Sequence, residues 1–98
     1  MKVEYSRDFE KTVRKLSGKV LASVKEAILE VRNAHNVNQL TNCKKLVGYN
    51  STYRLRIGDL RAFFVLHIEG DTVSFEYMVP RGEAYSKKMK EQLKRKDK

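Results

Sequence analysis

The stretch YRLRIGDLR at positions 53–61 constrains the fold more than any other part of this sequence, because it has the pattern of a β-hairpin. A two-residue turn at Gly58-Asp59 pairs Arg56 with Arg61 across the two strands. Arg54 then shares their face, because residues two apart on a strand point the same way. Like charges opposed across a sheet cost up to about 1 kcal/mol, and guanidinium groups suit phosphate. The hairpin therefore predicts either an anion-binding patch or a merely solvated basic face.

The charge balance points to a polyanionic partner. The chain has 98 residues, 34% of them charged, and a formal net charge of +9. This length suits a single domain, residues 1–98, built around one core. The positive excess is strongest at positions 81–98, where eight Lys or Arg stand against three Asp or Glu. Nucleic acid is the first partner to consider, although a basic segment also occurs simply as a solvated surface.

Several classes of protein are excluded by what the sequence lacks. Cys43 is the one cysteine, which rules out an internal disulfide and leaves no thiolate pair for a metal. We find no glycine-rich phosphate loop and no cluster of metal ligands, so we predict no metal and no cofactor. No signal-peptide pattern occurs, and no segment approaches the roughly 18 apolar residues of a membrane span. We expect a soluble, cytoplasmic protein in which Cys43 is a packed residue near the start of a strand.

Two helices are predicted in the first third of the chain, after a short edge strand at Val3–Tyr5. Ser6 is a good N-cap for the first helix, with acidic residues in its first turn. Ser17-Gly18 then interrupts the pattern before a longer amphipathic helix. The apolar stripe of that second helix consists of Val20, Leu21, Val24, Ala27, Ile28 and Val31. Two such helices joined by a short turn should pack as a hairpin.

The middle of the chain predicts an antiparallel meander of four strands at 44–49, 52–57, 60–68 and 72–79. A turn at Gly70-Asp71 pairs Glu69 with Thr72 and sets the register of the last two strands. One face then carries Ala62, Phe64, Leu66 and Ile68 against Val79, Tyr77, Phe75 and Val73, as the core beneath the helix hairpin. The opposite face carries Arg61, Phe63, Val65 and His67 against Pro80, Met78, Glu76 and Ser74. A short basic C-terminal helix with Tyr85, Met89 and Leu93 on one side completes an α+β fold.

The order of elements and three motifs give a resemblance to a known family. The motifs are Lys45–Tyr49, Tyr53–Arg61 and Val79–Tyr85. With them the chain resembles the RelE/ParE superfamily of bacterial toxins, and within it the RelE-like ribosome-dependent messenger-RNA endonucleases. The resemblance implies a toxin of a type II toxin–antitoxin system with a basic concave sheet face that binds messenger RNA in the ribosomal decoding site. It also implies a cognate antitoxin as partner.

The resemblance assigns roles to six positions of this sequence. The expected catalytic residues are Arg61, Arg81 and Tyr85, and the expected RNA- or phosphate-binding residues are Arg54, Arg56 and Lys45. Guanidinium groups would stabilise the extra charge of a phosphorane. Tyr85 stacks on a base, orients the nucleophile, or simply packs beside Met89 as a helix residue; the sequence does not choose among these.

One departure from the family pattern concerns proton transfer. Some relatives place a histidine or a lysine before the final arginine, where this chain has Pro80. His67 lies roughly 20 Å along the strand from Arg61, and His35 lies at a predicted helix end, where a cap is its expected role. Two other functions stay open at this point: a ParE-like gyrase inhibitor, which does not need the arginine set, and a basic RNA-binding protein without catalysis.

Overall fold

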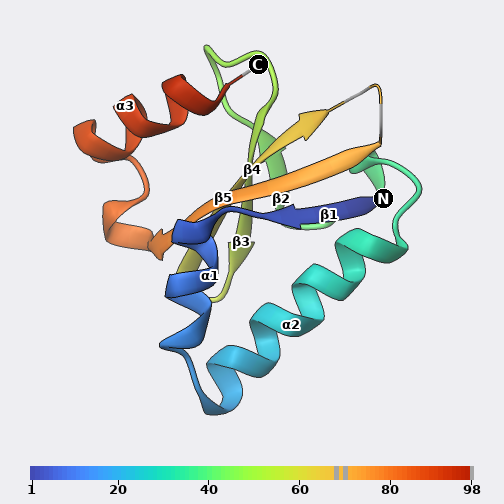
Figure 1. Ribbon diagram of the computed structural model, residues 1–98, viewed down its shortest axis with the longest axis vertical. Helices are drawn as coiled ribbons and strands as arrows, with labels where there is room; N and C mark the ends of the chain where they lie inside the picture. Colours follow the sequence, from blue (N-terminus) through green and yellow to red (C-terminus); the bar gives the residue numbers. More distant parts are fainter. Residues whose placement is uncertain (68, 70, 98) are drawn as a thin grey trace.

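The computed structural model describes residues 1–67, 69 and 71–97, and within them a five-stranded sheet in the order β1-β5-β4-β3-β2 (Figure 1). The strands are β1 (Lys2–Tyr5), β2 (Cys43–Lys45), β3 (Thr52–Ile57), β4 (Leu60–His67) and β5 (Thr72–Pro80). The helices are α1 (Arg7–Arg14), α2 (Gly18–Asn33) and α3 (Lys87–Lys96), with short 3₁₀ turns at Val37–Gln39 and Arg81–Glu83. Strands β2 to β5 form the predicted antiparallel meander, and β1 joins β5 in parallel.

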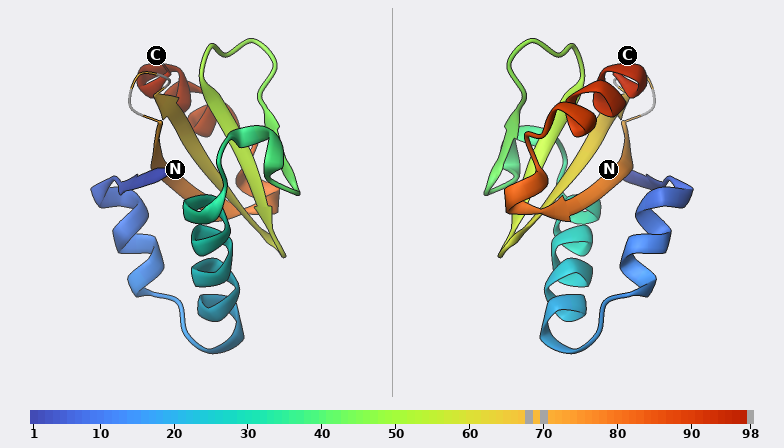
Figure 2. Two further views of the ribbon diagram at one scale, coloured as in Figure 1. Left: turned by 90° about the vertical axis from the view of Figure 1, so that its right-hand side faces the viewer. Right: turned by 90° about the vertical axis from the view of Figure 1, so that its left-hand side faces the viewer.

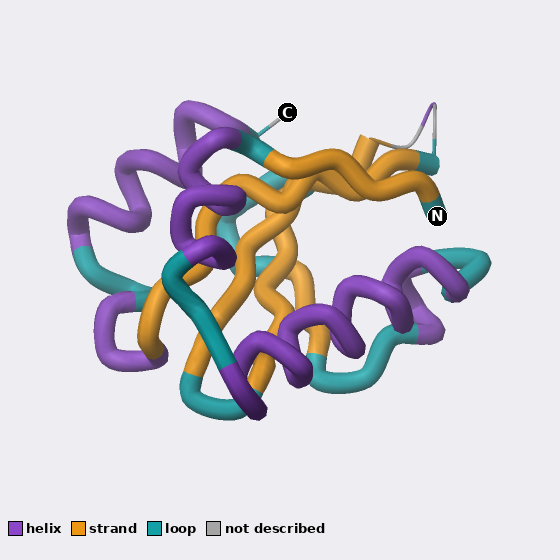
Figure 3. Tube along the Cα trace, turned by 60° about the horizontal axis from the view of Figure 1, so that its bottom comes forward, coloured by secondary structure: helices purple, strands orange, loops and turns teal. Residues whose placement is uncertain are grey.

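The sheet has a helix layer on each face, as Figures 2 and 3 show. Beneath α1 and α2 lies the larger core, in which Phe9 and Val24 pack with Phe64 and Phe75 of the sheet. The smaller core lies beneath α3 and is built around Phe63. Its other buried members are Leu46, Ala84, Met89 and Leu93. The predicted α+β fold is therefore confirmed, with the addition that α3 covers much of the second face.

Helix α1 begins where its capping residue predicts. The Ser6 hydroxyl accepts the N–H of Phe9 at 3.0 Å and itself donates to the carbonyl oxygen of Glu76 in β5. The Phe9 ring stacks on Phe75 with 5.0 Å between ring centroids. Ser6 thus closes the first turn of α1 and ties that turn to the sheet.

Helix α2 confirms the break at Ser17-Gly18 and most of the apolar stripe. Val24 and Val31 are completely buried. The predicted stripe also includes Val20, but 49% of this residue is exposed. It lies in the first turn of α2, where it lines a cleft with Ile57 and Leu60 at the β3–β4 turn.

The hairpin of β3 and β4 has the predicted register. Arg56 pairs with Arg61, and Ile57 pairs with Leu60 across a turn at Gly58-Asp59. Gly58 adopts a φ of +56°, a left-handed conformation that costs glycine little. The alternation of side chains between the two faces is therefore fixed from this turn onward.

Strand β2 is shorter than the predicted strand at 44–49. It ends at Lys45, and residues 46–51 form a loop. The N–H of Leu46 still bonds to Thr52, but Gly48 turns the chain with a φ of +85° and Tyr49 donates back to the Leu46 carbonyl. The chain therefore leaves the ladder at Leu46, and the Leu46 side chain is buried in the smaller core.

The predicted pairing of β4 with β5 is wrong, and a bulge is the reason. Phe63 pairs with Tyr77 while Phe64 pairs with Phe75, so Glu76 is an extra residue in β5. His67, and not Glu69, pairs with Thr72, whereas the proposed Gly70-Asp71 turn and the core position of Ile68 involve residues outside the described part of the chain.

The bulge exchanges the faces of the four residues that follow it in β5, from Tyr77 to Pro80. Tyr77 and Val79 pack into the core beneath α3 instead of the core beneath the helix hairpin, and Met78 takes the reverse position. Val73 and Phe75 remain in the larger core, as predicted.

The C-terminal helix is confirmed, with one correction. Ser86 caps it by accepting the N–H of Met89 at 3.2 Å, and both Met89 and Leu93 are buried. Tyr85 precedes the helix and is 48% exposed, so its interpretation as a helix residue packed beside Met89 is wrong. Among the described residues, no helix combines the length and the apolar character that crossing a membrane requires.

We predict that Ser6→Ala lowers the free energy of unfolding by about 1–2 kcal/mol, because both bonds of the hydroxyl are lost. Urea unfolding followed by circular dichroism measures this. Ser23→Ala, at an exposed position of α2, is the matched control and should change stability by less than about 0.5 kcal/mol. Equal effects of the two substitutions would contradict the role given to the Ser6 cap.

Candidate nucleic-acid interface

Three arginines lie on the face of the sheet that α3 only partly covers. Arg54 and Arg56 come from β3, and Arg61 of β4 stands directly opposite Arg56. Arg54 is opposite Phe63, which floors the smaller core. The sequence-predicted cluster is therefore brought together by the register of one hairpin.

The guanidinium groups of this cluster rest on neutral oxygen atoms. Arg56 Nη2 donates to the side-chain oxygen of Asn42 at 2.8 Å. Arg61 Nη1 donates to the carbonyl oxygens of Gly58 at 2.8 Å and Leu60 at 2.9 Å. The ion pairs found among the described residues, Arg14 with Glu10 and Lys96 with Glu76, involve none of these arginines. The positive charge of the patch is thus oriented by hydrogen bonds without being neutralised.

Arg81 is held beside the same hairpin turn. It follows Pro80, which pairs with Leu60, and its backbone N–H donates to the carbonyl oxygen of Asp59 at 2.8 Å. The residue is exposed. The backbone of a fourth arginine therefore lies at the end of the sheet that carries Arg56 and Arg61.

Tyr85 contacts the arginine cluster from the segment that leads into α3. Its hydroxyl lies 3.5 Å from Arg54 Nη1, at the long limit of a hydrogen bond. Arg54 Nε is buried and has no hydrogen-bond partner within the described part of the protein. Since about half of the Tyr85 side chain is exposed, one face of the cluster ends in an open aromatic ring.

The lysines of β2 divide between the two faces differently from the expectation. Lys44 pairs with Arg54, and Lys45 pairs with Tyr53 on the opposite side of the ladder. Lys44 is therefore the β2 lysine that shares the arginine face, and sequence reasoning missed it. Alternation along β2 shows that Lys44 and Lys45 lie on opposite faces. Only the pairing of β2 with β3 shows that Lys44 is the one on the arginine face. The phosphate-binding role of Lys45 stays a prediction.

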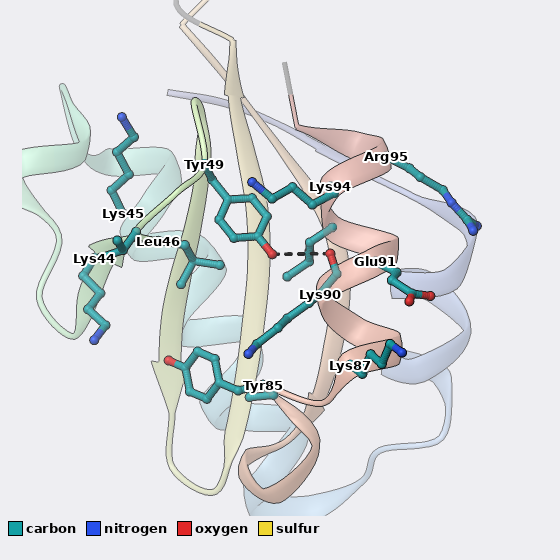
Figure 4. Close-up of a pocket in the computed structure, with 13 residues that line it drawn as sticks. Lys44, Lys45, Leu46, Tyr49, Tyr85, Lys87, Lys90, Glu91, Lys94 and Arg95 are labelled. Carbon is teal, nitrogen blue, oxygen red and sulfur yellow. Dashed lines mark hydrogen bonds between the residues drawn. The ribbon is translucent and has the colours of Figure 1, made fainter.

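A groove of about 880 Å³ lies between the 46–51 loop and α3, next to Tyr85; we call it the α3 groove (Figure 4). Six cations and one carboxylate line it: Lys44, Lys45, Lys87, Lys90, Lys94 and Arg95, with Glu91. Figure 4 shows Lys90 and Lys94 reaching from α3 toward the rings of Tyr85 and Tyr49, while Glu91 and Arg95 point away. The groove is therefore positive and has an aromatic ring near each end.

A set of polar contacts, which we call the α3 latch, holds α3 against the 46–51 loop. Asp97 accepts the N–H groups of Asn50 and Ser51 at 2.7 and 2.8 Å and the Thr52 hydroxyl at 2.9 Å. Lys94 donates to the Gly48 carbonyl and lies 4.2 Å from the centroid of the Tyr49 ring. The Tyr49 hydroxyl completes the latch by donating to the carbonyl oxygen of Lys90 at 3.3 Å (Figure 4).

The latch shifts the pKa values of two of its members. Burial acts to raise the pKa of Asp97, but the three hydrogen bonds and the nearby charge of Lys94 outweigh it, so the pKa lies below its ordinary value. Burial, and after it the negative charge of Asp97, raises the pKa of Tyr49. At neutral pH Asp97 is therefore charged and Tyr49 is a neutral donor.

Other residues with reactive side chains do not join the interface. Burial raises the pKa of the Cys43 thiol to about 11, and the charge of Arg54 lowers it only in part, so the thiol is protonated at neutral pH. His67 Nε2 lies 3.1 Å from the Ser74 hydroxyl. Within the residues that the structure describes, no three His, Cys, Asp or Glu side chains gather as a metal site would require.

Comparison with known proteins identifies the family. The chain is 31% identical to Toxin RelE3 of Methanocaldococcus jannaschii over 86 aligned residues. The alignment covers 87% of this chain and 96% of that protein. The chain belongs to the RelE toxin family. It is thus a RelE-family toxin of a toxin–antitoxin system. No protein-family model matches the chain.

Solved structures place the RelE fold on the same elements. The RelB–RelE antitoxin–toxin complex of Methanococcus jannaschii superposes with a TM-score of 0.70 at 27% identity, over 84% of this chain and 94% of that one. The RelE–RelB complex of Pyrococcus horikoshii gives 0.70 at 20% identity, over 85% and 97%. The isolated E. coli RelE toxin gives 0.66 at 18% identity, over 96% of each chain, so its likeness includes the C-terminal part.

We predict that Asp97→Asn lowers the free energy of unfolding by about 1–3 kcal/mol at pH 7, because a charged acceptor of three hydrogen bonds is replaced by a neutral amide. A carboxylate with a lowered pKa stabilises the fold above its unfolded pKa of about 3.9, and this stabilisation disappears as the pH falls through the folded pKa. The difference between wild type and variant should therefore narrow below about pH 4.

Urea unfolding at pH values from 7 down to 3 tests this expectation. Glu91→Gln removes the same charge from an exposed position of the same helix and is the control. A difference between Asp97→Asn and wild type that stays constant over this range would show that the charge of Asp97 does not hold the latch.

Proposed function

We propose that this RelE-family toxin is a ribosome-dependent messenger-RNA endonuclease that stops translation. In the proposed reaction the 2′-hydroxyl of the RNA attacks the adjacent phosphorus, and the bond from phosphorus to the leaving 5′ oxygen breaks. The proton of the 2′-hydroxyl is removed and the 5′ oxygen is protonated, which yields a 2′,3′-cyclic phosphate and a 5′-hydroxyl. The RNA supplies its own nucleophile, so the protein has to align it, stabilise charge and assist proton transfer.

The observation that carries the proposal is the arginine cluster at the β3–β4 turn. Arg56 and Arg61 face each other, and no carboxylate forms an ion pair with either within the described chain. A phosphorane carries one more negative charge than the phosphodiester from which it forms. Preorganised donors aimed at such charge typically contribute about 3–4 kcal/mol each to the transition state. Charges that are oriented but not neutralised in this way favour a role in stabilising the transition state of RNA cleavage over the alternative of a merely solvated surface.

The six positions take the following roles in the proposal. Arg61 and Arg81 clamp the scissile phosphate and stabilise the phosphorane. Arg54 and Arg56 contact the phosphates of the RNA backbone, and Lys45, which lines the α3 groove, contacts a further phosphate. Tyr85 stacks on a base beside the scissile bond, since its ring is open and its hydroxyl meets Arg54.

A cognate antitoxin and the ribosome are the proposed partners, and the cytoplasm is the proposed compartment. The relatives from Methanococcus jannaschii and Pyrococcus horikoshii were solved as complexes of RelE with RelB. A net charge of +9 favours an acidic antitoxin segment as well as ribosomal and messenger RNA.

We predict that induction of the wild type in growing cells creates new 5′ ends within the codons of translated messages, and that Arg81→Ala abolishes them. Loss of one charge-stabilising donor typically costs about 10²- to 10³-fold in rate. Sequencing of 5′ ends after short induction measures this. Arg14→Ala, an exposed arginine of α1, is the control and should cut like the wild type.

Other outcomes of this experiment would point elsewhere. Growth arrest without new 5′ ends would contradict the nuclease proposal and favour a target such as gyrase. Binding to RNA with neither arrest nor cleavage would favour a non-catalytic RNA-binding protein. New ends that persist in Arg81→Ala would keep the activity but remove Arg81 from the site.

We predict that Tyr85→Leu lowers cleavage of message on purified ribosomes by about 10- to 100-fold, as loss of one stacked base implies, while Tyr85→Phe retains most of the rate. Single-turnover cleavage of a programmed ribosome measures both variants. A rate in Tyr85→Phe as low as that of Tyr85→Leu would shift the role of the residue from its ring to its hydroxyl, which would then orient the nucleophile or transfer a proton.

A further inference from the structure

We propose that the α3 groove binds the single-stranded RNA that continues from the scissile phosphate, so that α3 and the 46–51 loop form a second RNA-binding surface beyond the arginine cluster. The position of the scissile phosphate in this inference rests on the proposed function. The groove itself uses residues to which that function gives no role, above all Lys90 and Lys44.

The groove has the chemistry of a surface that binds single-stranded nucleic acid. Surfaces that hold single strands combine a row of cations along the backbone with aromatic rings on which bases stack. Lys90 extends from α3 into the groove, Lys94 crosses it to the Gly48 carbonyl, and Lys44 lines the opposite wall. The exposed ring of Tyr85 lines the same space and is available for stacking, whereas the Tyr49 ring is held in the latch beneath Lys94. Glu91, the one carboxylate among the lining residues, points away together with Arg95, so the charges that remain toward the groove are lysines.

The α3 groove is continuous with the arginine cluster. Tyr85 lines the groove, and its hydroxyl lies 3.5 Å from Arg54 Nη1. Lys44, on the other wall, is the direct strand partner of Arg54. A chain whose phosphate lies on the arginines therefore reaches the groove without crossing any other element. The volume of about 880 Å³ lies near the upper end of the range for small-molecule sites, which leaves room for more than one base.

The exposed lining of the groove suits RNA better than it suits a protein helix. An amphipathic helix needs a strip of exposed aliphatic surface into which its apolar side chains fit. The aliphatic floor of this groove is already covered, since Leu46, Ala84 and Leu93 are at most 8% exposed. Val47, on the loop, is 98% exposed but stands alone. With these residues covered, the exposed lining of the groove consists of Val47, the tyrosine rings and long charged side chains, and the ammonium groups among them suit the phosphates of a nucleic-acid strand.

The α3 latch adds that the groove exists before any ligand binds. Asp97 and Lys94 fix both walls relative to each other through the Asn50, Ser51 and Gly48 backbone. A preformed site spends little of its binding energy on ordering the protein. Direct binding of a short RNA to the free toxin should therefore be measurable without the ribosome.

The test uses fluorescence anisotropy with a labelled 12-nucleotide single-stranded RNA whose 2′-hydroxyls are methylated, so that binding is separated from cleavage. Lys44→Gln/Lys90→Gln removes one cation from each wall and should weaken binding about tenfold. The slope of log affinity against log salt should fall by about 1.4, as loss of two phosphate contacts with a single strand implies. Lys19→Gln/Lys25→Gln removes the same charge from α2 and should change affinity less than about twofold. If the double variant is not folded, Lys90→Gln alone at its exposed helix position serves instead.

Three results would overturn the inference. The first is an absence of binding by the wild type at 50 mM salt. The second is equal weakening by the groove variant and the α2 control, which would reduce the effect to net charge. The third is displacement of the RNA by an equally charged 12-residue glutamate-rich peptide at the same or lower concentration, which would assign the groove to an acidic protein segment. Because no cleavage is measured, failure here leaves the endonuclease proposal standing, and failure of that proposal leaves this binding result valid.

Discussion

The tight turn between β3 and β4 is the constraint on which the rest of the structure depends. Gly58 reverses the chain in two residues, and that reversal fixes which side chains of both strands face α1 and α2. Leu55 and Ile57 enter the larger core for the same reason that Arg54 and Arg56 face the other way. A shift of one residue would bury the guanidinium groups and expose the core. The interface and the core are thus two consequences of one register.

Local chemistry made part of this fold predictable from the sequence. The Ser6 cap, the break at Ser17-Gly18 and the hairpin at Gly58-Asp59 are each specified by residues a few positions apart. The pairing of β4 with β5 could not be predicted in this way, because each of these strands places apolar side chains in both cores. The neighbours Phe63 and Phe64 belong to different cores, so hydrophobic alternation cannot show where Glu76 interrupts the ladder.

In the candidate interface too, the features that depend on residues close in sequence were predictable, and those that depend on distant residues were not. The arginines were found from the sequence because a hairpin places them within a few residues of one another. The α3 latch joins positions that are 41–47 residues apart, such as Asp97 with Asn50 and Thr52, and no short-range sequence pattern predicts such contacts. From the sequence alone, Asp97 has the pattern of a solvated helix end. Its role appears only when the structure shows the 46–51 loop beside it. The face given to Lys44 likewise emerged only from the pairing of β2.

The parallel pairing of β1 with β5 has a consequence for how the chain acquires its structure. Val3 pairs with Val73, and Phe9 of α1 stacks on Phe75, so the earliest part of the chain waits for contacts about seventy positions later. Contacts this distant in sequence slow folding, because the loop between them must close before they contribute. Arg81 lies beyond that same late strand. A chain still being synthesised therefore has neither a closed larger core nor Arg81 beside the arginine cluster until β5 and Arg81 have emerged.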